Sequence, residues 1–66
     1  MATDLKTITT VEDADQAISE TEEAIEKGEK AIFDGAPWAS HDMVERRRQE
    51  LRELKQHRAK LVAANS

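Results

Sequence analysis

The sequence predicts an all-α protein: an antiparallel helical hairpin of two long helices joined by an Asp-Gly-Ala-Pro turn, which associates into an oligomer. An apolar seven-residue repeat fills the first half of the chain, one Gly/Pro break interrupts the middle, and helix-forming residues fill the second half. Of the 66 residues, 36% are charged and only 3% are aromatic. This composition suits exposed helices better than a sheet.

The chain is too short to build a large core. A domain of this size buries only about 60% of the surface of its unfolded chain. Small domains therefore usually need disulfides, a metal or a partner chain. Because the sequence contains no cysteine and only two histidines, we expect association to supply the missing stability. We expect one domain over residues 10–66, preceded by a flexible arm over residues 1–9, which lack a helical period.

The first helix is expected at about residues 11–33. Thr10 is an N-cap candidate, with Asp13 three positions later. Large apolar residues then recur every seven positions with small residues between them, which indicates one apolar stripe that a second helix can approach closely. Gly28 costs about 1 kcal/mol inside a helix, so either close packing requires it or the helix ends there. The large residues are Val11, Ile18, Ile25 and Ile32, and the small ones are Ala14, Thr21 and Gly28.

Residues 34–39 are expected to form the turn. Asp34-Gly35 favours a turn, and Pro37 disfavours a helical conformation at the residue before it. A short β-hairpin over residues 31–39 is the alternative, because small and apolar residues flank the Asp-Gly pair on both sides. The proline and the shortness of both arms weigh against that alternative.

The second helix is expected at about residues 40–63, with Ser40 as its N-cap. Its apolar stripe is thinner than the first and includes two arginines. We expect each arginine to lay its aliphatic stem along the stripe and to reach a carboxylate of the first helix. The stripe positions are Val44, Arg47, Leu51, Leu54, Arg58 and Leu61.

The two halves of the chain carry opposite charge. Residues 11–34 hold nine acidic and two basic side chains, a net charge of −7, whereas residues 40–66 hold seven basic and four acidic ones, a net charge of +3. Opposite charges favour helices that lie side by side in one molecule or head to tail between copies.

No catalytic, cofactor or metal site is predicted. The chain has no glycine-rich phosphate loop, no cysteine nucleophile and no HExxH motif. A two-helix chain is also expected to lack a pocket of the several hundred Å³ that a small molecule needs. His41 and Glu45, with Asp42 nearby, could share a metal ion, but so few ligands at an exposed helix start bind metal poorly. We therefore expect no enzyme.

Arg46-Arg47-Arg48 is the densest basic run. It could contact phosphates, but no aromatic residue is interleaved for base stacking, and three consecutive residues do not share one helix face. We favour pairing with acidic side chains of this chain or of a partner protein.

Trp38 and Phe33 are the only aromatic residues. Trp38 either caps the end of the apolar stripe or anchors a partner protein, since tryptophan is common among interface hot spots. No apolar run approaches the roughly 20 residues of a membrane span, and no signal-peptide pattern opens the sequence. We therefore expect a cytoplasmic protein, or a virion protein if a phage encodes it.

The order of helix, Asp-Gly turn, polar cap and charged helix resembles the W-type head-completion or head–tail connector proteins of lambda-like phages. The similar stretch covers residues 11–63 and includes AISETEEAIEKGEKAIFDGAPWASHDMVERRRQELRELKQHRAKL. Ser40 and Asp42 stand where that family opens its second helix. The resemblance implies a ring component that binds below the portal, closes the filled head and receives the tail. The same outline resembles small hairpin co-chaperones of type III secretion needle subunits and phage hairpins that inhibit host proteins.

These observations predict a structural interaction protein, a homo-oligomer or a component of a larger assembly. The alternative is a small regulatory hairpin that inhibits or chaperones one protein. The interface is expected to comprise both apolar stripes and the turn tryptophan: Val11, Ile18, Ile25, Ile32, Trp38, Val44, Arg47, Leu51, Leu54, Arg58 and Leu61.

Overall fold

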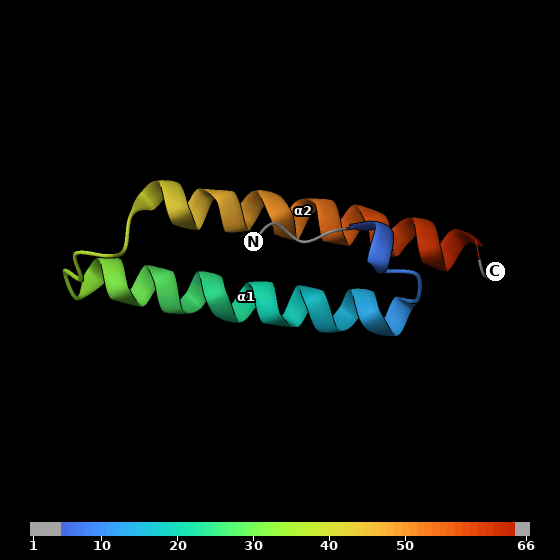
Figure 1. Cartoon of the computed structure of the whole chain (residues 1–66), viewed down its shortest axis with the longest axis horizontal. Coiled ribbons are helices and arrows are strands. Elements are labelled where there is room, and N and C mark those ends of the chain that lie inside the picture. Colours follow the sequence, from blue (N-terminus) through green and yellow to red (C-terminus); the bar gives the residue numbers. More distant parts are fainter. Residues whose placement is uncertain (1–4, 65–66) are drawn as a thin grey trace.

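The computed structural model describes residues 5–64, which form two antiparallel helices and one short turn (Figure 1). Helix α1 spans Val11–Phe33, helix α2 spans His41–Ala64, and a 3-10 turn, Leu5–Thr7, precedes them. The molecule is a rod of 46 × 15 × 14 Å. The predicted helical hairpin is confirmed. Within the described residues there is no strand, so the β-hairpin alternative for residues 31–39 is wrong.

Both helices begin at the predicted side-chain caps. The backbone N–H of Asp13 donates to Thr10 Oγ1 at 3.1 Å, and the N–H of Met43 donates to Ser40 Oγ at 3.2 Å. Each bond satisfies one of the N–H groups that the first turn of a helix leaves without a partner.

Helix α1 continues through Gly28 and ends at a Schellman motif. The N–H of Gly35 donates to the carbonyl of Ile32 at 3.0 Å, and the N–H of Ala36 donates to that of Ala31 at 2.9 Å. Gly35 has a φ of +78°, the left-handed conformation that glycine adopts most easily. The Asp-Gly pair therefore stops the helix by its backbone geometry.

The helices meet over the small residues of the α1 stripe. Ala14, Thr21 and Gly28 are buried, whereas the large residues seven apart, from Val11 to Ile32, are only half-buried. A Cβ atom added to Gly28 would lie 3.0 Å from Val44 Cγ2. Because α2 approaches this closely, the large side chains lie beside the contact and remain partly exposed.

The main apolar cluster lies at the end of the rod where α1 begins and α2 ends. Ile8, Ala14 and Leu54 are buried there, and Leu5, Ala17, Ile18 and Leu61 pack against them. His57 Nε2 lies 2.6 Å from the carbonyl oxygen of Ile8 and donates a hydrogen bond to it. Residues 1–4 of the expected flexible arm lie outside the described residues. In the rest of that arm, Ile8 is only 7% exposed, so this segment packs on the hairpin.

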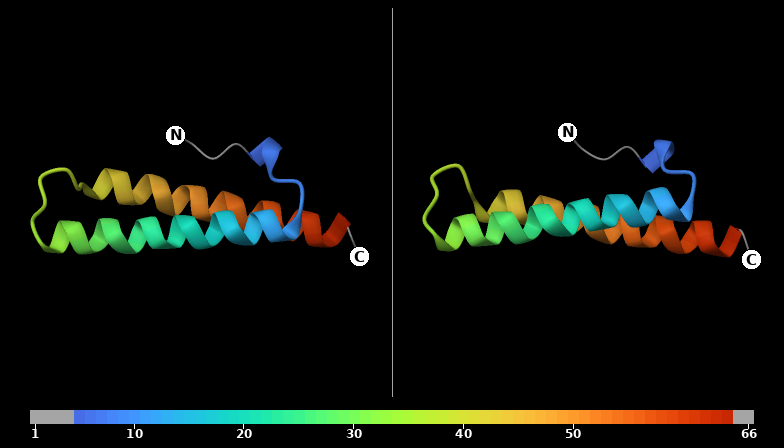
Figure 2. Two further views of the ribbon diagram at one scale, coloured as in Figure 1. Left: turned by 60° about the horizontal axis from the view of Figure 1, so that its bottom comes forward. Right: turned by 90° about the horizontal axis from the view of Figure 1, so that it is seen from below.

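The segment before α1 covers only one side of the two-helix layer. Figure 2 shows the 3-10 turn standing on one broad side of the hairpin, with no described segment on the opposite side. None of the described helices is long and apolar enough to cross a membrane.

Candidate protein-binding surfaces

The side of the hairpin opposite the 3-10 turn carries an apolar surface, which we name the open face. Among its side chains Val44 is buried and the others are partly exposed. Their seven-residue spacing along both helices places them in two adjacent columns. The open face consists of Val11, Ile18, Ile25, Ile32, Val44 and Leu51.

Two ion pairs join the helices along the open face. Arg48 Nη2 lies 2.5 Å from Glu29 Oε1, and Arg58 Nε pairs with Asp15 Oδ1. Arg58 thus reaches a carboxylate of the first helix, as predicted for the arginines of the stripe. All four side chains are about half exposed, so each pair contributes little free energy of folding.

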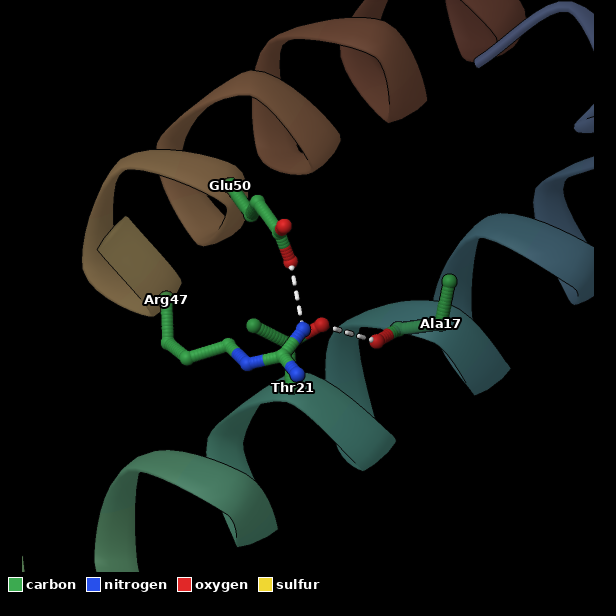
Figure 3. Close-up of polar contacts among 4 residues, drawn as sticks. All are labelled: Ala17, Thr21, Arg47 and Glu50. Carbon is green, nitrogen blue, oxygen red and sulfur yellow. Dashed lines mark hydrogen bonds and ion pairs between the residues drawn. The ribbon is translucent and has the colours of Figure 1, made fainter. Parts of the chain in front are cut away.

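Arg47 differs from this prediction. Its Nη1 lies 3.1 Å from Oε2 of Glu50, a carboxylate of its own helix. Figure 3 shows its guanidinium beside Thr21, whose hydroxyl donates to the carbonyl of Ala17 at 2.8 Å. At this level α1 presents a threonine and no carboxylate, so Arg47 finds its partner one turn along α2. The middle of the helix contact is therefore polar.

The basic run on α2 does not form a separate positive surface. Arg47 and Arg48 each have a carboxylate partner. Arg46 makes no ion pair within the described part of the chain. The run is thus largely used in contacts within the hairpin.

The loop end of the rod exposes both aromatic side chains. Phe33 is 90% exposed and Trp38 is 65% exposed. We name this pair the aromatic tip. An exposure this large does not fit a tryptophan that caps the apolar stripe, and it favours the interpretation of Trp38 as an anchor for a partner.

A groove of about 440 Å³ lies next to the aromatic tip. The expectation that two helices offer no pocket of this size is wrong, because no third segment covers the space between the helix ends here. The groove has a lining of both apolar and polar side chains. It is lined by Glu29, Ile32, Phe33, His41, Val44, Glu45 and Arg48.

His41 and Glu45, the metal candidates of the sequence, both line this groove. In the part of the chain that the structure describes, no group of three or more His, Cys, Asp or Glu side chains could hold a metal ion. The two residues therefore act as polar walls of the groove.

Two contributors to these surfaces escaped the sequence analysis. Phe33 was expected to end the first helix and was given no role in binding, yet it is the most exposed large apolar side chain among the described residues. Ile8 was assigned to the arm, although its spacing of three from Leu5 is that of one 3-10 turn. That spacing is the one signal that could have indicated a docked segment.

No protein-family model matches this sequence, and no curated protein or solved structure is significantly similar to it. The likeness to phage connector proteins therefore rests on the sequence pattern alone.

Proposed function

We propose that this chain is a non-enzymatic interaction protein that works as a structural component of a larger assembly and binds protein through its open face. The observation that carries the proposal is the surface left uncovered. Val11, Ile18, Ile25, Ile32 and Leu51 stay partly exposed along one side of the hairpin, and no described segment covers that side (Figure 2).

Energetics also support binding through the open face. Its partly exposed isoleucine side chains remain in contact with water in the single hairpin. Covering them removes apolar surface from water at about 25 cal/mol per Å². A short chain with a small core gains most from this additional burial.

A phage head–tail connector is the most specific version of this function. It rests on the resemblance of residues 11–63 to W-type proteins, in which a small helical chain works only as part of a ring. A connector binds proteins on both sides of the neck, and this hairpin offers apolar contacts along the open face and at the aromatic tip, which meet at the groove.

The first test is the solution mass by size-exclusion chromatography with light scattering over a range of concentrations. Ile25→Asp places a charge in the middle of the open face and should abolish assembly while circular dichroism still reports helix. Ser19→Asp adds the same charge at an exposed position of α1 outside the open face and should leave the mass unchanged. If the wild-type chain assembles, an Ile25→Asp protein with unaltered mass and helicity would contradict the proposal.

A regulatory binder is the second candidate, and the aromatic tip is the observation that favours it. Such a protein uses Phe33 and Trp38 to bind one target, with the hairpin as a rigid support. Once a target is purified, Trp38→Ala should weaken its affinity by at least tenfold, in the range of interface hot spots. Val62→Ala removes a 43% exposed apolar side chain near the other end of the rod and serves as the control. Equal affinity of both variants would exclude the tip as the anchor.

A further inference from the structure

We propose that a second copy of this chain covers the open face, with α1 of each copy lying over α2 of the other and both loops at the same end. This inference rests on the proposed function, because it names the partner of the same surface. Its product is a four-helix bundle with a twofold axis parallel to the helices.

The first argument is the charge along the edges of the open face. Asp15, Glu22 and Glu29 each precede an isoleucine of the apolar column by three residues, so they form an acidic edge on α1. Arg48 and Lys55 lie four residues after Val44 and Leu51 and form a basic edge on α2. Asp15 and Glu29 pair with Arg58 and Arg48 within the hairpin, so the charges left without an ion pair on these edges are Glu22 on α1 and Lys55 on α2.

The second argument is that these charges lie within side-chain reach of one another along the rod. The Arg48–Glu29 pair shows that two long side chains at this offset can meet. Glu22 is seven residues before Glu29 and Lys55 is seven residues after Arg48, so in an antiparallel hairpin Glu22 and Lys55 have the same offset along the rod. Neither of them makes an ion pair in the single hairpin within residues 5–64.

Two copies can stack open face against open face with twofold symmetry in two ways, and the charges favour one of them. An axis across the helices places α1 over α1, so acidic edge meets acidic edge. An axis along the helices places α1 of one copy over α2 of the other without shifting either along the rod. Glu22 of each copy then faces Lys55 of the other. Like charges across an interface are unfavourable and opposite charges guide association. The electrostatics therefore favour the axis along the helices, in which all neighbouring helices are antiparallel.

The segment before α1 limits the assembly to two copies through this surface. It occupies the other broad side of the layer near the termini (Figure 2), where Ile8 is hydrogen-bonded to His57. Hairpins therefore stack on one side only, and the stack closes as a dimer.

The arrangement has a consequence for the aromatic tip. Because both loops lie at the same end, the dimer presents two copies of Phe33 and Trp38 together. The opposite arrangement would place them at the two ends of the rod, 46 Å in length. A same-end dimer is thus bivalent toward one partner surface.

Spin-label distances test the arrangement directly. The sequence has no cysteine, so Pro37→Cys gives one label in each loop. We expect a dimer by light scattering and a label separation comparable to the 15 × 14 Å cross-section of one hairpin. A dimer with a separation comparable to the rod length would overturn the arrangement. A monomer at every concentration would overturn self-association, yet the proposed function would survive if Ile25→Asp still impaired binding to another protein.

Charge reversal provides the second readout. Glu22→Lys should weaken the dimer several-fold. Adding Lys55→Glu to the same chain should restore it, because residues 22 and 55 then carry opposite charges again at both contacts between the copies. Glu23→Lys, on an exposed position of α1 away from the open face, is the matched control. In the alternative stack of α1 on α1, Glu22→Lys would strengthen association, since it removes a like-charge contact. That result would contradict the proposal.

Discussion

At the end of the rod where α1 begins and α2 ends, which we call the terminal end, three segments meet around Leu54, which is fully buried. At the loop end only two helices meet, and Phe33 and Trp38 are largely exposed. The first end thus has a small but complete core. The second has a close backbone contact at Gly28, a groove and the aromatic tip.

The two ends therefore contribute differently: one to the free energy of folding and the other to the surface available for binding. Large apolar side chains stabilise a fold when they are removed from water, as Ile8 and Leu54 are at the terminal end. The aromatic side chains at the loop remain in water, where they add little stability and are available to a partner. The terminal end therefore maintains the hairpin, and the loop end offers the exposed apolar contacts.

The strongest effect on stability is expected at Leu54. Leu54→Ala leaves a cavity where three segments meet and should lower the free energy of unfolding by about 3 kcal/mol. Val44→Ala removes a smaller side chain at the loop end and should cost about 2 kcal/mol. Urea denaturation followed by circular dichroism measures both. If Val44→Ala proved the more damaging change, the main core would lie at the loop end and the comparison would be reversed.

The docked segment before α1 is the next test of the terminal end. Ile8→Ala removes most of a buried side chain and should cost about 2 kcal/mol. Thr9→Ala, at the exposed neighbouring position, is the control and should stay within about 0.5 kcal/mol. Equal stability of the two variants would mean that the segment does not contribute to the core.

Much of the hairpin could be predicted because its signals are local. Thr10 and Ser40 accept hydrogen bonds from the first turn of the helix that follows each of them, and Gly35 ends the helix before it. Their roles therefore follow from neighbouring residues. The seven-residue period likewise places the apolar stripe on one face of α1.

The remaining features depend on contacts between distant residues. Ile8 docks because α2 places Leu54 and His57 beside it, which no local pattern reveals. Arg47 pairs within its own helix because Thr21 occupies the level opposite it (Figure 3). The open face and the aromatic tip follow from which sides the third segment leaves uncovered. The sequence names the residues of both surfaces, but it does not show how exposed each side chain is.

The two glycines sharpen the description of the loop end. Gly35→Ala should cost about 1 kcal/mol, because an alanine is strained at a φ of +78° even though the added Cβ has open space around it. Gly28→Ala gains about 1 kcal/mol of helix propensity, but its Cβ meets Val44 Cγ2 at 3.0 Å. We expect these terms to offset each other, and Gly28→Ala should become stabilising when combined with Val44→Ala. If the combined variant gained nothing from the alanine at 28, close helix packing would not explain this glycine.

The smallest effect on stability is expected where the exposed apolar surface is largest. Phe33→Ser and Trp38→Ala alter side chains that make little contact with the hairpin, so each should change the free energy of unfolding by no more than about 0.5 kcal/mol. A substantial loss would mean that the aromatic tip packs on the hairpin in solution and belongs to its core. With stability unchanged, any loss of partner binding in the same variants must come from the contact itself. The two aromatic residues would then be explained by binding, because folding does not require them.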